Sequence, residues 1–246
     1  NETGRTLTFA QINNLGNYLG QLFCQDYGLK QGDRVAILAE NCLEYLALFT
    51  MAQKTGLILV PLNYRLATAE IDYLVDNCQP DLLIVEEKYL DKITGRKEKQ
   101  LPLAKLTALC NSHKNHATPI KLPTVKIAED DPIFILYTSG TTGFPKGVCY
   151  SHKMLFWNSI NTAMSLIINT ESRTVNCMPP FHTGGWNVLT TPFLHHGGYT
   201  CFLKKFDPEA TLRLIEKEKT TIFMGVPTML KMMAALPAFQ QANFSY

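Results

Sequence analysis

The chain has 246 residues, of which 46% are apolar and 18% charged, and its formal net charge is +2. This composition predicts a globular chain with a large buried core and excludes a disordered or fibrous one. A charge this small and dispersed does not favour nucleic acid or an anionic membrane as a partner. No apolar run approaches the ~18 residues of a membrane-spanning helix, so we expect no integral membrane segment.

Seven cysteines are scattered along the chain without a C-x-x-C pair, and their odd number leaves one unpaired in a fully oxidised chain. We therefore expect free thiols and a reducing, cytoplasmic setting. The chain starts at Asn1 and ends at Tyr246 without a helix-ending signal. We expect both ends to be cut from a longer protein.

Short apolar strands alternate with amphipathic helices in the first part of the chain. Thr8 and Asn41 are the expected caps of two helices, and Gly28 and Gly56 are the expected stops. We expect helices over residues 8–28, 41–56 and 68–78, and strands over residues 34–39, 57–60 and 81–86. This alternation predicts an α/β fold in which βαβ units form mostly parallel sheets flanked by helices.

Apolar periodicity fades over residues 87–129, which we expect to form an irregular surface excursion. The expected domain organisation is a first α/β subdomain over residues 1–130 and a second over residues 131–246. His113 and His116 fall in the excursion without cysteine or carboxylate partners, so we expect solvated loop residues rather than a metal site.

Strands and helices alternate again in the second subdomain. We expect strands over residues 133–137, 174–177, 199–203 and 221–224, and helices over residues 151–168, 186–194 and 208–219. Ser151 is the expected cap of the first of these helices.

The strand ending at Tyr137 runs directly into a segment that is rich in hydroxyl groups and glycine. Glycines let backbone N–H groups converge on phosphate oxygens, hydroxyls donate further hydrogen bonds, and one lysine supplies a positive charge. The candidate ATP-phosphate-binding residues are Thr138, Ser139, Gly140, Thr141, Thr142, Gly143 and Lys146.

Three other interpretations fit these residues less well. A plain surface turn would not need so long a run directly after an apolar strand. A Walker-type P-loop needs Gly before the lysine and Ser or Thr after it, whereas Lys146 stands between Pro145 and Gly147. The chain also lacks the G-x-S-x-G turn of an α/β-hydrolase.

Residues 137–148 resemble the phosphate-loop signature of the adenylate-forming superfamily, which contains acyl-CoA synthetases, luciferases and peptide-synthetase adenylation domains. The likeness continues in order along nearly the whole chain, through residues 61–65 with Glu70, 179–185, 205–206 and 226–228. The resemblance implies ATP-dependent activation of a carboxylic acid, foremost a fatty acid, to an acyl-adenylate and then to an acyl-CoA thioester. It implies ATP, Mg²⁺ and coenzyme A as cofactors and co-substrates.

The resemblance also assigns further site residues. His182, with Thr183 and Gly184, would border the substrate entrance and the acyl pocket, although a structural histidine is the plain alternative. Lys205 would approach the coenzyme A phosphates, unless it is simply a solvated charge. The adenine-binding segment, a magnesium-contacting glutamate and a mobile C-terminal domain have no counterpart before Tyr246. We therefore expect no certain catalytic residue and no metal ligand in this fragment, which should be inactive alone.

The sequence is compatible with several other functions. The acid could be aromatic or a succinylbenzoate, and the acceptor could be a carrier-protein thiol instead of coenzyme A. A non-catalytic nucleotide- or acyl-adenylate-binding protein is the alternative from another class, and a P-loop ATPase is the residual one. A homodimer is compatible with the resemblance.

Overall fold

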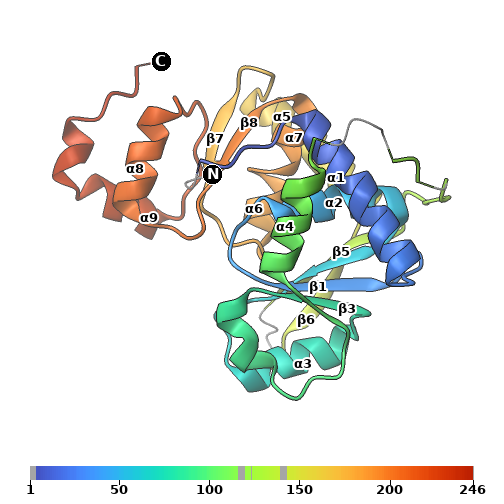
Figure 1. Cartoon of the computed structure of the whole chain (residues 1–246). Helices are drawn as coiled ribbons and strands as arrows, with labels where there is room; N and C mark the ends of the chain where they lie inside the picture. Colours follow the sequence, from blue (N-terminus) through green and yellow to red (C-terminus); the bar gives the residue numbers. More distant parts are fainter. Residues whose placement is uncertain (1–3, 116–119, 123, 139–142, 246) are drawn as a thin grey trace. The chain divides into compact units, whose positions relative to one another are not determined.

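The computed structural model describes residues 4–115, 120–122, 124–138 and 143–245. The chain divides into two compact units (Figure 1), here called the first unit, Thr6–Met154, and the second unit, Leu155–Tyr246, to which residues 4 and 5 also belong. The expected division near residue 130 differs from this one, because the last strand pair of the sheet described next keeps residues 131–154 in the first unit.

A six-stranded sheet in the order β4-β3-β1-β2-β5-β6 organises the first unit. Its strands are β1 (Arg34–Leu38), β2 (Ile58–Pro61), β3 (Leu82–Val85), β4 (Gln100–Pro102), β5 (Pro132–Thr138) and β6 (Lys146–Ser151). All neighbours are parallel except β6, which is antiparallel to β5. Every residue of β2 and β3 is buried, as expected for parallel strands covered on both faces. The predicted α/β fold with a mostly parallel sheet is confirmed.

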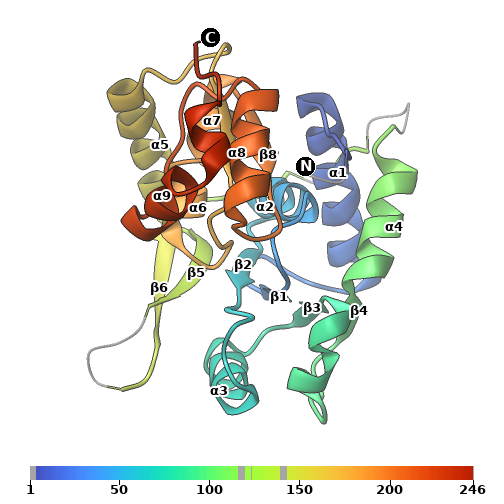
Figure 2. The same cartoon turned by 90° about the vertical axis from the view of Figure 1, so that its left-hand side faces the viewer.

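Helices cover both faces of this sheet. The helical segments are α1 (Phe9–Gln21), the π-helix η1 (Leu22–Asp26), α2 (Glu44–Thr55), α3 (Thr68–Cys78), the 3₁₀-helix η2 (Glu87–Ile93) and α4 (Leu103–His113). Figures 1 and 2 show α1, α2 and α4 together on one face and α3 on the opposite face. Among the described residues, no helix is long and apolar enough to cross a bilayer.

The helix α1 begins where the sequence predicts. The Thr8 hydroxyl accepts from the Gln11 N–H at 3.2 Å, and the Gln11 side chain accepts from the Thr8 N–H at 2.8 Å, which completes a capping box. Farther along α1, Gly16 lies against Thr50 of α2, so closely that an added Cβ would come within 2.5 Å of the Thr50 methyl carbon. The packing of α1 on α2 therefore depends on the absence of a side chain at Gly16.

Three local expectations for the first unit need correction. Residues 87–129 are not simply irregular, because η2, β4 and α4 form there and β4 extends the sheet. The N-cap position of α2 is Leu43 and not the expected Asn41, which is buried. The edge strand β6 was not expected, because most of its residues are exposed and so carry no alternating apolar pattern.

The second unit contains a two-stranded parallel sheet, β7 (Arg173–Asn176) and β8 (Tyr199–Phe202). Its helical segments are α5 (His152–Leu166, whose first turn belongs to the first unit), α6 (Thr183–Asn187), α7 (Thr191–His196), α8 (Pro208–Lys217), α9 (Pro227–Ala234) and the 3₁₀-helix η3 (Pro237–Gln240). Ser151 caps α5 as predicted, since its hydroxyl accepts from the Met154 N–H at 3.2 Å.

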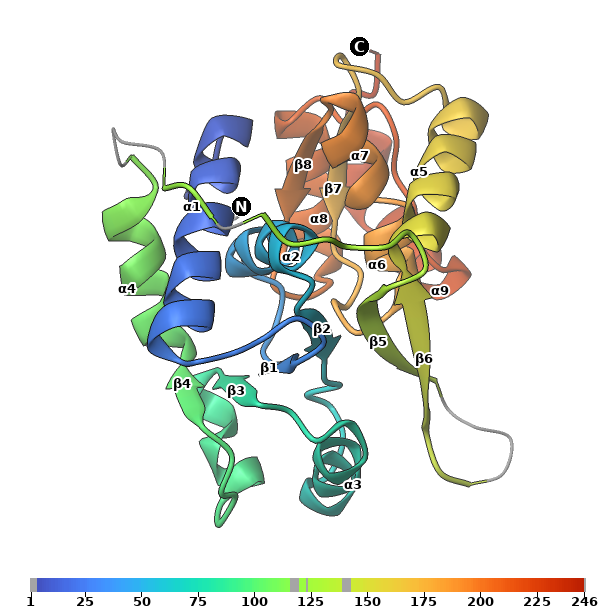
Figure 3. The ribbon, with the colours of Figure 1, turned by 90° about the vertical axis from the view of Figure 1, so that its right-hand side faces the viewer.

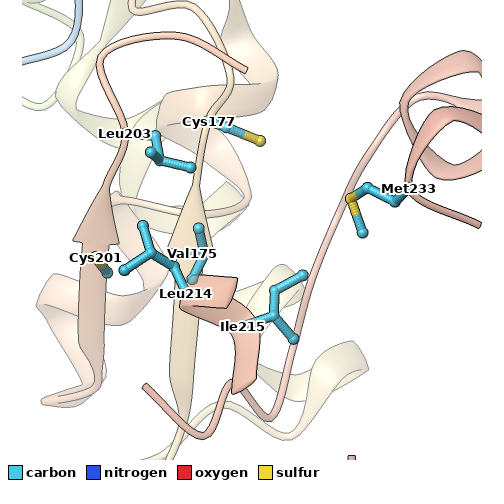
Figure 4. Close-up of a cluster of buried hydrophobic side chains, with 7 residues drawn as sticks. All are labelled: Val175, Cys177, Cys201, Leu203, Leu214, Ile215 and Met233. Carbon is cyan, nitrogen blue, oxygen red and sulfur yellow. The ribbon is translucent and has the colours of Figure 1, made fainter. Parts of the chain in front are cut away.

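One buried cluster joins β7 and β8 to α8 and α9 (Figure 4). Its members are Val175, Cys177, Cys201, Leu203, Leu214, Ile215 and Met233. The two cysteines act here as small apolar groups, and burial raises the pKa of the Cys177 thiol to about 11. All seven cysteines of the chain lie in the described part and carry free thiols.

Two expectations for the second unit also need correction. The single helix expected over residues 186–194 is two short helices, α6 and α7. The strand expected over residues 221–224 does not form, because only its start reaches β7: the N–H groups of Thr221 and Ile222 donate to the Arg173 carbonyl at 2.9 and 3.1 Å.

A larger residue at the α1–α2 contact tests this packing. We expect Gly16→Val to lower the free energy of unfolding by about 1–3 kcal/mol, because the new side chain overlaps Thr50. Urea unfolding followed by far-UV circular dichroism measures the change. Ala10→Val, at an exposed position of the same helix, is the matched control and should cost no more than about 0.7 kcal/mol of helix propensity. Equal stability of the two variants would show that the helices do not need this close approach.

Candidate functional site

The β5–β6 hairpin holds both ends of the predicted phosphate-binding segment. Thr138, the last residue of β5, pairs directly with Lys146, the first residue of β6. Opposite residues of an antiparallel pair place their side chains on the same face of the sheet. The side chains of Thr138 and Lys146 therefore leave the hairpin on the same face, and both residues are exposed. Ser139, Gly140, Thr141 and Thr142 lie outside the described residues.

The backbone and the charge of this hairpin suit an anionic ligand. Gly143 has a φ of 100°, in the region that favours glycine over every other residue. Among the residues that the structure describes, Lys146 forms no ion pair with a carboxylate, so its charge is available. A hydroxyl and an uncompensated cation beside a glycine turn are the groups that bind phosphate oxygens.

The stems of the hairpin are attached to α3. The Tyr137 hydroxyl donates to Asn77 Oδ1 at 2.7 Å, and it also lies 3.2 Å from the carbonyl oxygen of Leu74. Burial, with a further contribution from the Cys78 thiol, raises the pKa of Tyr137, so this hydroxyl keeps its proton at neutral pH. On the other stem, the Tyr73 hydroxyl donates to the Pro145 carbonyl at 3.3 Å. Sequence reasoning missed these attachments.

In the second unit, Asn176 organises the segment that contains the predicted entrance histidine. Its side-chain amide donates to the Gly185 carbonyl and to the Thr190 hydroxyl, each at 3.0 Å, and its oxygen accepts from the Met178 N–H at 3.0 Å. Asn176 is 2% exposed, so these bonds replace water almost completely. Trp186 adds a hydrogen bond from its indole N–H to the Pro180 carbonyl at 2.7 Å.

This network presents His182 at the surface of the second unit. His182 is the N-cap of α6 and is exposed, whereas Phe181 beside it is buried, and the two rings lie 4.8 Å apart. Thr183 and Gly184 form the first turn of α6. Lys205 is exposed in the segment between β8 and α8. Thr138 and Lys146 belong to the first unit. His182, Thr183, Gly184 and Lys205 belong to the second unit.

Other histidines have structural contacts. The ring of His113 stacks on Tyr18 with 3.7 Å between centroids, which accounts for it without a metal; His116 lies outside the described residues. His195 Nδ1 lies 2.8 Å from the Ser159 hydroxyl, an arrangement like that of a hydrolase nucleophile and its base. Ser159 is fully buried, however, and therefore out of reach of a substrate. In the described part of the chain, no group of three or more His, Cys, Asp and Glu residues could hold a metal ion.

Comparison with known proteins identifies the family. The family described as AMP-binding enzyme matches residues 1–246. The indoleacetate–CoA ligase of Aromatoleum aromaticum is 32% identical over 249 residues, which cover 98% of this chain and 49% of that protein. The long-chain-fatty-acid–CoA ligase FadD13 of Mycobacterium tuberculosis is 30% identical over 242 residues, which cover 96% of this chain and 48% of that protein. The chain thus spans about half the length of these relatives.

Solved structures give the same result. The inhibitor-bound N-terminal domain of FACL13 from Mycobacterium tuberculosis superposes with a TM-score of 0.84 at 27% identity, over 99% of this chain and 62% of that one. ATP-bound MatB from Rhodopseudomonas palustris has a TM-score of 0.82 at 28% identity, over 96% of this chain and 47% of that one. The resemblance seen in the sequence is confirmed: the chain belongs to the AMP-binding enzyme family, among relatives that are acyl- and aryl-CoA ligases.

Proposed function

We propose that this chain supplies the ATP-phosphate site of an AMP-forming ligase that joins a carboxylic acid to coenzyme A. The observation that carries the proposal is the β5–β6 hairpin, which pairs Thr138 with the exposed Lys146 at the base of the glycine- and hydroxyl-rich segment. The family match and the ATP-bound structural relative support a nucleotide at this segment.

The reaction has two steps. In the first, the acid carboxylate attacks the α-phosphorus of ATP, and pyrophosphate leaves with the electron pair of the broken P–O bond. In the second, the thiol of coenzyme A attacks the acyl carbon and AMP leaves. Both the carboxylate and the triphosphate are anionic, so positioning and charge neutralisation provide most of the catalysis. Lys146 neutralises charge on the departing pyrophosphate, while Thr138 and the hydroxyls of Ser139, Thr141 and Thr142 hold its oxygens.

Magnesium fits this arrangement as a companion of the nucleotide. Mg²⁺ usually keeps several waters and binds through substrate phosphates with one or two carboxylates, instead of a cage made by the protein. The lack of a three-ligand cluster among the described residues is compatible with this mode of binding. When bound, Mg²⁺ would neutralise part of the triphosphate charge beside Lys146.

The second unit is proposed to serve the acid and the thiol. The Asn176 network presents His182, Thr183 and Gly184, which we assign to the entrance of the acyl pocket. The exposed Lys205 is assigned to the phosphates of coenzyme A. The free cysteines suit a reducing compartment, and we place the protein in the cytoplasm.

The names of the relatives point to two classes of acid. A fatty acid remains the first substrate to test, since FadD13 is named for long-chain fatty acids. An aromatic acid is the second candidate, because the relative with 32% identity is named for indoleacetate. Transfer to a carrier-protein thiol is distinguished from these by the acceptor and not by the acid.

Exchange of labelled pyrophosphate into ATP tests the first step in the complete protein that carries this chain. We expect exchange that depends on one acid class, and we expect Lys146→Ala to lower its rate by about 10- to 100-fold, the value of one charge-assisted hydrogen bond. Lys105→Ala, which removes an exposed lysine from α4, is the matched control and should leave the rate unchanged. Binding of ATP without exchange for any fatty or aromatic acid would favour the non-catalytic alternative.

Truncation of Asn176 tests the organisation of the acid-binding segment. We expect Asn176→Ala to lower the free energy of unfolding by about 1–3 kcal/mol, because it removes three hydrogen bonds, to Gly185, Thr190 and Met178, at a buried position. In the exchange assay, KM for the acid should rise more than KM for ATP.

Asn158→Ala is the comparison for this variant. It removes a single hydrogen bond, from the Asn158 side chain to the Asn187 carbonyl at 2.7 Å, and should cost only about 0.5–1.5 kcal/mol. If both variants lose the same stability and neither changes KM for the acid, the network does not position the segment.

A further inference from the structure

The helix α3 lies beside the outer part of the β5–β6 hairpin, as Figures 2 and 3 show. The family resemblance assigns α3 no role in the reaction, and no sequence pattern connects α3 with the segment between β5 and β6. The contacts between them are specific, however, and involve both stems of the hairpin.

On the incoming stem, the contact starts from Tyr137, one residue before Thr138. Its hydroxyl donates to Asn77 Oδ1 at 2.7 Å and lies 3.2 Å from the Leu74 carbonyl. The hydrogen bonds of Tyr137 therefore help to fix the backbone that continues into Thr138, the last residue of β5.

On the outgoing stem, the contact involves the residue before Lys146. The Tyr73 hydroxyl donates to the Pro145 carbonyl at 3.3 Å, and the ring of Tyr73 lies against that of Phe144, with 5.0 Å between centroids. Proline has no N–H and a fixed φ, so its carbonyl is a well-defined point of attachment. Residues four apart on a helix share one face, so Tyr73 and Asn77 contact the two stems from the same side of α3.

Gly147 makes this arrangement possible. It pairs with Tyr137 across the hairpin, and a Cβ at Gly147 would lie 2.9 Å from the Ile135 side chain and 3.4 Å from the Tyr137 ring. The ring of Tyr137 can therefore lie close to β6 on its way to Asn77. A larger residue immediately after Lys146 would displace the Ile135 side chain, whereas the Tyr137 ring would be at ordinary van der Waals distance.

We propose that Tyr73 and Asn77 of α3 are positioning residues for the nucleotide: through Pro145 and Tyr137 they orient Lys146 and Thr138 toward the triphosphate. The proposal rests on the proposed function of the hairpin. Neither residue touches the nucleotide. Both act on the stems, so their loss should weaken binding of ATP and slow adenylation without affecting the acid.

The contacts could instead serve only the stability of the sheet, and kinetics separates the two roles. In the complete protein, Tyr73→Phe and Asn77→Ala should each raise KM for ATP by roughly 3- to 10-fold, the effect of one ordinary hydrogen bond. KM for the acid and the thermal midpoint should stay near the wild-type values. Tyr18→Phe, on α1 and on the other face of the sheet, is the matched control for loss of a phenolic hydroxyl and should change nothing.

A double-mutant cycle links the effect to the contact. If Asn77 acts through the Tyr137 hydroxyl, the double variant Tyr137→Phe/Asn77→Ala should be no worse than the more affected single variant. Tyr73→Phe should add to either, because it acts on the other stem. Additive effects of Tyr137→Phe and Asn77→Ala would overturn the proposed route.

Amide hydrogen exchange without nucleotide makes the proposal testable even if the ligase reaction is not found. We expect faster exchange at the β5 and β6 amides nearest the hairpin end in Tyr73→Phe and Asn77→Ala, and unchanged exchange in β1 to β3. The positioning role is refuted, and the proposed function kept, if ATP–pyrophosphate exchange is normal while KM for ATP and the amide hydrogen exchange of the hairpin are unchanged in both variants. If amide hydrogen exchange in the hairpin is faster but no acid is adenylated, the attachment of the hairpin to α3 stands and the proposed function is refuted.

Discussion

Antiparallel pairing of β5 with β6 is the constraint on which the candidate site depends, because it brings the two ends of a polar, glycine-rich segment together at Thr138 and Lys146. Bringing the two ends of a chain segment together costs conformational entropy. The hydrogen bonds of the paired strands offset this cost. β5 in turn pairs with β2 in the buried parallel part of the sheet, so the polar segment is ultimately supported by the core of the first unit.

In the second unit, a buried side chain has the role that strand pairing has in the first unit. The sheet of the second unit has only two strands, and the turn after β7 cannot be held by strand pairing alone. A buried side chain, Asn176, replaces backbone partners by bonding to Gly185, Thr190 and Met178. Because a satisfied buried amide specifies one arrangement and tolerates few others, the segment that carries His182 is well defined despite its two glycines. In each unit, specific hydrogen bonds fix the described residues nearest the candidate site: strand pairing at Thr138 and Lys146, and the Asn176 amide in the segment that carries His182.

Much of the fold could be predicted from the sequence. Caps such as Thr8 and buried apolar runs such as residues 81–86 are local signals, and local signals are what a sequence displays most directly. The prediction was wrong where tertiary contacts decide. β6 is an exposed edge strand that exists because β5 is beside it. Residues 221–224 look like a strand but reach β7 only at one end. The composition of residues 138–146 predicts phosphate binding, whereas the contacts of Tyr73 and Asn77 with the hairpin could not be predicted, because the residues that they contact are more than fifty positions away.

The register of the hairpin has a consequence for how the segment can vary. Side chains alternate between the two faces of a strand, so a shift of one residue moves every side chain to the opposite face. If one residue were gained or lost between Gly143 and Lys146, either the ammonium would turn away from Thr138 or the pairing of Tyr137 with Gly147 would break. Substitutions along the segment change single contacts, whereas a change of length disrupts all of them at once. Spacing is therefore as much a part of this site as the identity of its residues.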